Sequence, residues 1–112
     1  TFKEAFEQLR IKNKIDKNDM VDMLHTSLSS LKRWLLSPDE NISIDFVVAV
    51  SLMLQLPDWI SDLLFDRAGK QLSDKIPRHR ALKYILRVMW MDGIDKANEF
   101  LEKKGFKRLN IG

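Results

Sequence analysis

Two helix-start signals near the N-terminus constrain the fold more than any other feature of the sequence. Asp16 and Ser27 are both residue types that cap helix N-termini, and each is followed by apolar residues at helical spacing. The stretch between the two segments is only a few residues long. We therefore predict two short helices, at about 17–24 and 27–36, joined by a tight turn.

The apolar residues of these two segments fall where the helices can pack on each other. Val21 and Leu24 lie on one face of the first segment, and Leu31 and Trp34 lie three residues apart in the second. Their convergence leaves the opposite face of the second helix free. This pattern predicts a helix-turn-helix, in which the first helix braces the second.

Helical spacing and caps continue through the rest of the chain, and strand-like alternation is nearly absent. The sequence therefore predicts an all-α fold with a five-helix core in residues 1–69 and a C-terminal helical extension in 70–112. We expect this extension to be a hairpin packed on the same domain or on a partner. Besides the two helices above, the pattern predicts helices at about 2–13, 44–55, 57–67, 77–91 and 94–104, a loop at 37–41 and a tail at 106–112.

Charge is divided unevenly along the 112 residues, although the net charge is only +3. Residues 1–66 hold 7 Lys/Arg and 11 Asp/Glu, a net charge of −4. Residues 67–112 hold 12 Lys/Arg and 5 Asp/Glu, a net charge of +7. Any long-range attraction for a polyanion is therefore expected to come mainly from the C-terminal part.

Residues 2 to about 66 resemble the phage-repressor/Cro-like (XRE-type) helix-turn-helix family of bacterial transcriptional regulators. Asp16 stands at the family's usual Ser/Thr cap, and Lys17 at the polar position that opens the second helix. Ser27 stands at the cap of the recognition helix, and Leu31 to Trp34 matches that helix's ending. The resemblance implies a repressor-like core and a dimeric DNA-binding regulator that reads the major groove of double-stranded DNA.

The resemblance also implies which side chains face DNA. Leu28, Lys32 and Arg33 would reach base edges or phosphates, and the serine hydroxyls would donate to either. The complete predicted interface is Lys14, Lys17, Ser27, Leu28, Ser29, Ser30, Lys32 and Arg33. Arg78 and Arg80, in a basic cluster that opens the sixth helix, are predicted auxiliary phosphate contacts.

Several residues depart from the family pattern. Leu28 replaces a polar base-reading residue, and His25 replaces the Gly of a turn position that often needs positive φ. Asp39 and Glu40 follow the recognition helix, where carboxylates would repel phosphates. The alternative hypothesis is therefore a protein–protein interaction module that keeps a degenerate helix-turn-helix.

Other functional classes find little support in the sequence. There is no cysteine, His25 and His79 lie far apart, and no nucleophile motif or phosphate-binding loop is present. We therefore expect no enzyme activity, metal, cofactor or small-molecule ligand, and a cytoplasmic protein without a membrane span. The three tryptophans are expected in helices and in the core, and Trp90 with Met89 and Met91 is the best candidate for a dimer or partner patch.

Overall fold

Seven α-helices and one short 3-10 helix make up the chain in a computed structural model, which describes residues 1–111. No strand occurs within these residues, so the predicted all-α class is confirmed. In chain order the elements are α1 (Phe2–Lys12), α2 (Lys17–Leu24), α3 (Leu28–Leu36), η1 (Asp39–Asn41), α4 (Ile44–Met53), α5 (Asp58–Arg67), α6 (Pro77–Val88) and α7 (Gly93–Lys103).

The predicted caps of α2 and α3 are confirmed. The Asp16 carboxylate accepts a 2.8 Å hydrogen bond from the Asp19 amide, and the Asp19 carboxylate accepts one of 3.2 Å from the Asp16 amide. This reciprocal capping box satisfies two amides that a helix start leaves unpaired. The Ser27 hydroxyl accepts from the Ser30 amide at 3.1 Å. Local hydrogen bonds thus fix where both helices begin.

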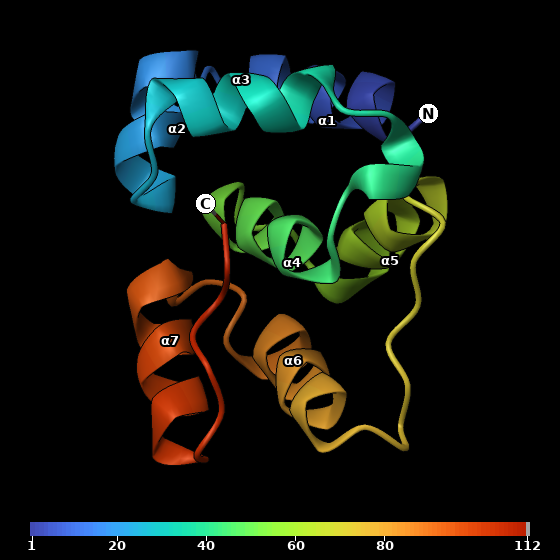
Figure 1. Cartoon of the computed structure of the whole chain (residues 1–112), viewed down its shortest axis with the longest axis vertical. Helices are drawn as coiled ribbons and strands as arrows, with labels where there is room; N and C mark the ends of the chain where they lie inside the picture. The colour runs from blue at the N-terminus through green and yellow to red at the C-terminus, as the bar shows by residue number, and fades with distance from the viewer. Residues whose placement is uncertain (112) are drawn as a thin grey trace.

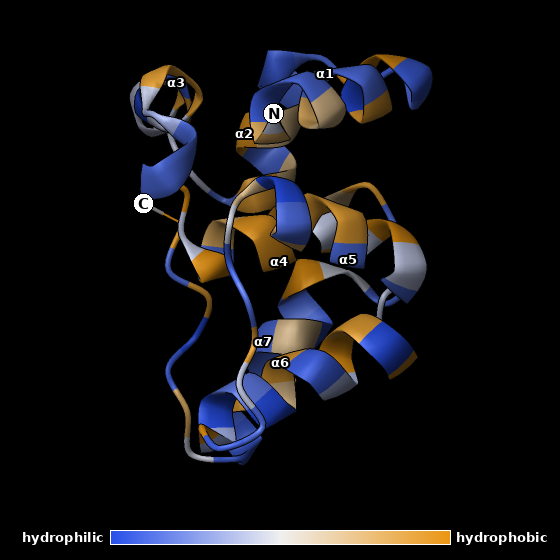
Figure 2. Ribbon diagram, turned by 90° about the vertical axis from the view of Figure 1, so that its right-hand side faces the viewer, coloured by the Kyte–Doolittle hydropathy of each residue, from blue (hydrophilic) through white to orange (hydrophobic). Residues whose placement is uncertain are grey.

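Helix α4 lies at the centre of the molecule. It contacts α2 and α5 on one side and α6 and α7 on the other (Figure 1). Every residue from Phe46 to Met53 is buried, and Figure 2 shows hydrophobic residues gathered along this helix. The two parts that the sequence divides at about residue 70 therefore meet on one shared core helix.

A cluster of aromatic rings joins α1 and α3 to α4. The Phe46 ring stacks on Trp34 with their centroids 5.0 Å apart. The rings of Phe2 and Phe6 meet Phe46 edge-on, at 6.4 and 6.5 Å. Offset and edge-to-face pairs of this kind add stability beyond the area they bury. The orientation of α3 relative to the core depends on this cluster.

The C-terminal tail, predicted at 106–112, runs back beside α3 and α4 over residues 106–111 (Figure 1); Gly112 lies outside the described residues. Leu109 and Ile111 are buried, and the Leu109 amide donates to the Asn98 side chain at 2.8 Å. The Trp34 indole Nε1 donates to the Ile111 carbonyl at 2.6 Å. The tail therefore holds the inner side of α3 from below (Figure 1).

Three expectations need correction. Helix α6 ends at Val88, not near residue 91, because a turn closes there with a 2.9 Å bond from the Asp92 amide to the Met89 carbonyl. Val88 at this end of α6 is 59% exposed, and Trp90 lies in the turn, outside any helix. Trp59 is 71% exposed, because it lies on α5 opposite the buried face.

Two smaller points complete the fold. Residues 39–41 of the predicted loop form the helix η1. Of the helices in residues 1–111, none has the length and apolar character that crossing a bilayer requires.

Candidate nucleic-acid interface

Helix α3 has a buried face and an exposed face. Leu31 is fully buried, and Trp34 is half-buried against Phe46. On the opposite side, Lys32 and Arg33 are exposed. Of the other predicted residues on this helix, Ser29 is exposed, Leu28 is 40% exposed, and Ser30 is half-buried. The structure therefore brings most of the predicted groove-facing residues together on one outer surface.

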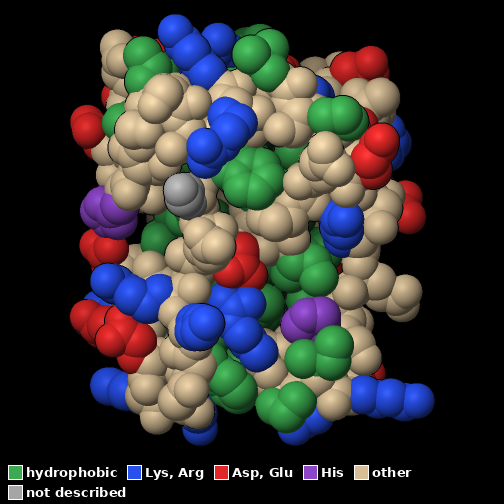
Figure 3. All heavy atoms as spheres, in the orientation of Figure 1, with side chains coloured by type: hydrophobic (Ala, Val, Ile, Leu, Met, Phe, Trp, Pro, Cys, Tyr) green, Lys and Arg blue, Asp and Glu red, His purple; other side chains and the backbone are tan. Residues whose placement is uncertain are grey.

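On this surface the two cations have no partner in the described chain, whereas the serine hydroxyls contact one another. Within residues 1–111, the Lys32 and Arg33 side chains make no ion pair or hydrogen bond, so both cations are free for a ligand. The Ser27 hydroxyl lies 3.1 Å from the hydroxyls of both Ser29 and Ser30. In Figure 3, Lys and Arg side chains gather over α3 and again over the C-terminal tail.

The turn between α2 and α3 depends on a left-handed residue. His25 has φ 52° and ψ 44°, and its amide donates to the Asp22 carbonyl at 3.3 Å. The next amide, of Thr26, donates to the Val21 carbonyl at 3.1 Å, which completes a Schellman-type end of α2. The position thus has the positive φ that the sequence analysis anticipated. The His25 Nε2 also pairs with the Asp95 carboxylate of α7 at 2.8 Å.

Replacing His25 with glycine is expected to give a protein about 1 kcal/mol more stable than the His25→Ala variant. Both variants lose the exposed pair with Asp95, but only glycine removes the Cβ that opposes a left-handed conformation. Urea unfolding of the two variants measures the difference. Equal stabilities, or a more stable alanine variant, would show that the turn carries no such strain.

Lys14 and Lys17 lie at the other end of α2 from the turn, about 12 Å away along an eight-residue helix. Both side chains are exposed. Arg10 fixes the segment between α1 and α2, because its guanidinium donates to the Ile15 carbonyl at 2.8 Å. The same guanidinium pairs with Glu7 and keeps the pKa of that carboxyl below its usual value. The two lysines therefore lie at a fixed place before and at the start of α2.

The acidic loop after α3 is only partly directed at this surface. One Asp39 oxygen accepts from the Phe2 amide at 3.1 Å, and the side chain is half-buried. Asp39 thus satisfies an amide at the start of α1, a role the sequence analysis missed because the partners lie 37 residues apart. Glu40 is exposed, and its carbonyl accepts from Lys70 at 3.0 Å. Of the two carboxylates expected to repel phosphates, that of Asp39 is therefore hydrogen-bonded to the start of α1.

The two arginines predicted as auxiliary contacts differ sharply. The Arg78 guanidinium forms two hydrogen bonds with the Asp45 carboxylate, at 2.8 and 2.9 Å, and also donates to the carbonyls of Lys107 and Arg108. These contacts engage most of its N–H groups inside the fold, so the expectation that Arg78 is an open phosphate contact needs revision. Arg80 is exposed, and within residues 1–111 its side chain donates only to the Asp74 carbonyl.

Comparison of the chain with models of protein families, with curated proteins and with solved structures gave no match. The function is therefore inferred from the geometry and charge of the surface itself. In the part of the chain that the structure describes, no three His, Asp or Glu side chains lie close enough together to hold a metal ion.

Proposed function

We propose that this protein binds double-stranded DNA and regulates transcription, with α2 and α3 acting as a helix-turn-helix inside a repressor-like core of α1 to α5. The observation that carries the proposal is the outer face of α3, where Lys32 and Arg33 are exposed beside Ser29 and form no ion pair within residues 1–111. A helix of this width fits the major groove, and Arg and Lys are the side chains that pair best with guanine edges.

The surroundings of α3 suit this role. Lys14 and Lys17 are two further exposed cations, which we expect to contact phosphates beside the groove. The indole bond of Trp34 and its stacking on Phe46 hold α3 from the inside, so the outer face needs no rearrangement to bind. A fixed reading surface loses little conformational entropy on binding.

The second candidate function is protein binding through the same helix. Leu36 is 83% exposed at the end of α3, and Leu28 is 40% exposed at its start. Apolar side chains at both ends of an outward face are typical of helix-in-groove contacts between proteins. This candidate requires no DNA affinity, so one binding experiment distinguishes it from the first.

The test is the binding of the intact chain to duplex DNA of mixed sequence, followed by fluorescence anisotropy at two salt concentrations. We expect binding that weakens as salt rises, because each phosphate contact releases counterions. The double variant Lys32→Ala/Arg33→Ala should lose about 10- to 100-fold in affinity, and its salt dependence should become shallower.

The matched control is Lys103→Ala/Lys104→Ala, which removes the same charge from exposed positions at the end of α7. It should affect binding far less than the α3 variant. Equal losses in both variants would mean that net charge alone attracts the DNA. Absence of salt-dependent binding in the unaltered chain would exclude the DNA proposal and favour the protein-binding candidate.

A further inference from the structure

The outer face of α5 is acidic and apolar. Asp62 and Asp66 are exposed on it, and so are Trp59 at 71% and Leu63 at 43%. Among residues 1–111, no cation forms an ion pair with Asp58, Asp62 or Asp66. Trp59 is the largest side chain so exposed in the described chain. Such a face has charge and apolar area without a partner inside the molecule.

The neighbouring face of α6 is basic. Arg80 and Arg87 are exposed, and Lys83 is half-buried in a 2.6 Å pair with Asp74. Arg87 has no ion pair within residues 1–111. Tyr84 and Val88 add exposed apolar area next to these cations. The two adjacent helices α5 and α6 therefore carry opposite charge on one side of the molecule.

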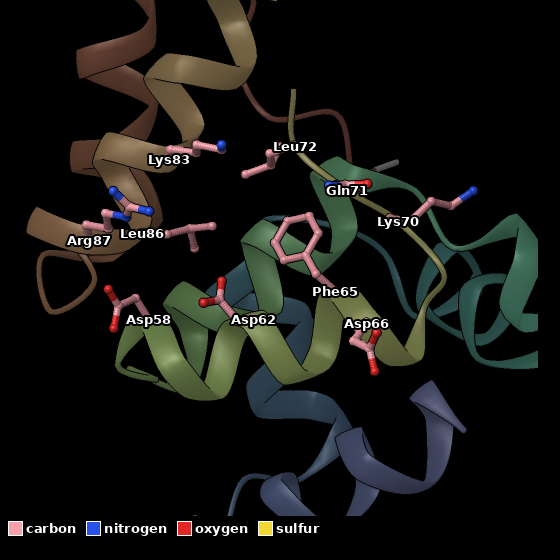
Figure 4. Close-up of a pocket in the computed structure, with 10 residues that line it drawn as sticks. All are labelled: Asp58, Asp62, Phe65, Asp66, Lys70, Gln71, Leu72, Lys83, Leu86 and Arg87. Carbon is pink, nitrogen blue, oxygen red and sulfur yellow. The ribbon is translucent and has the colours of Figure 1, made fainter. Parts of the chain in front are cut away.

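A groove of about 480 Å³ separates the two faces. Asp58 and Asp62 project from α5 on one wall, and Lys83 and Arg87 from α6 on the other (Figure 4). Its floor is apolar and consists of Phe65, Leu72 and Leu86. The opposite charges face each other across the groove without closing it.

We infer that this α5–α6 face binds a second copy of the chain about a two-fold axis through the groove. A two-fold axis exchanges the two walls, so the acidic α5 of each copy meets the basic α6 of its partner. The exposed indole of each Trp59 would then lie against α6 of the partner, where Tyr84 and Val88 are exposed. A buried aromatic side chain beside complementary charges is a common anchor of a stable interface.

This inference rests on the proposed function for its purpose, because one recognition helix reads few bases and a two-fold pair reads two half-sites. It relocates the dimer patch expected from the sequence. Met89 and Trp90 are half-buried and only Met91 of that patch is exposed, whereas Trp59 of α5 and Val88 at the end of α6 are both exposed. The uneven distribution of charge along the chain fits this interface, because the acidic α5 belongs to the negative part and the basic α6 to the positive part.

The test is a pair of charge reversals in the intact chain, analysed by sedimentation velocity. Asp62→Lys alone places like charges opposite each other at both halves of the interface, and so does Arg87→Glu alone. Each is expected to weaken dimerisation at least about 100-fold. An equimolar mixture of the two variants should dimerise again, because both contacts in the mixed pair then join opposite charges.

The controls Glu99→Lys and Lys103→Glu change the charge equally on exposed positions of α7 and should leave dimerisation unchanged. Circular dichroism verifies that each variant is folded. The inference is overturned if the unaltered chain is monomeric, if the single reversals still dimerise, or if the mixture stays monomeric. DNA binding that still depends on Lys32 and Arg33 in a monomeric protein would overturn the dimer and leave the proposed function standing.

Discussion

The Phe46→Ala variant is expected to lose about 3–5 kcal/mol in its free energy of unfolding. Phe46 is fully buried, and its ring contacts the rings of Phe2, Phe6 and Trp34 from two other helices. Alanine would leave a cavity that these rings cannot fill, since each is held by its own helix. Urea unfolding followed by circular dichroism measures the loss.

The same substitution should loosen α3 more than it loosens the rest of the molecule, because Trp34 loses its stacking partner. Phe65→Ala is the matched control, since Phe65 is a buried phenylalanine of α5 and has no ring contact with α3. Amide hydrogen exchange is expected to quicken in α3 relative to α6 only in the Phe46 variant. If both variants quicken exchange in α3 to the same degree, the aromatic cluster does not specifically hold that helix.

The parts of this fold that could be predicted are those set by local chemistry. The caps at Asp16 and Ser27 act on amides three residues away, so a short window of sequence contains both partners. The burial of Leu31 follows in the same way from spacing along one helix. The exposure of Lys32 and Arg33 follows from the same period, which is why the outer face of α3 could be named in advance.

The parts that could not be predicted depend on residues far apart in the chain. The bond from the Phe2 amide to Asp39 and the pair of His25 with Asp95 join segments 37 and 70 residues apart. The exposure of Trp59 has the same origin. Tryptophan is a residue type expected in the core. Which side of α5 is buried, however, depends on where α1, α4 and α6 pack.

Left-handed residues form an intermediate case. Glycine is the usual sequence signal for a left-handed helix end, and Gly105 after α7 fits this rule with φ 82°. Lys14 and Gln55 adopt the same conformation after α1 and α4, with φ 56° and 51°, yet neither residue type signals it. Only the family resemblance drew attention to His25. At all three ends the amide of the next residue donates to a carbonyl five positions back, so the same local hydrogen bond closes each helix whatever the residue type.

The contact between Arg78 and Asp45 provides the second large expected effect, and it separates a structural arginine from a phosphate-binding one. Two charge-assisted hydrogen bonds, each side chain mostly shielded from solvent, join α6 to the start of α4. The Asp45 carboxylate also accepts from the Asn110 amide at 2.8 Å, so the pair anchors the C-terminal tail. We expect Arg78→Ala and Asp45→Ala each to lower the free energy of unfolding by about 2–3 kcal/mol.

The double variant should lose clearly less than the sum of the two single losses, because each single change removes the same contact. Arg80→Ala is the matched control. The Arg80 side chain is exposed, so the free energy of unfolding of this variant should differ from that of the unaltered chain by less than about 0.5 kcal/mol. At a temperature where every variant is folded, Arg78→Ala should bind DNA like the unaltered chain. An Arg78 variant of unchanged stability and weakened, less salt-dependent DNA binding would instead restore Arg78 as a phosphate contact and show that its pair with Asp45 does not anchor the tail.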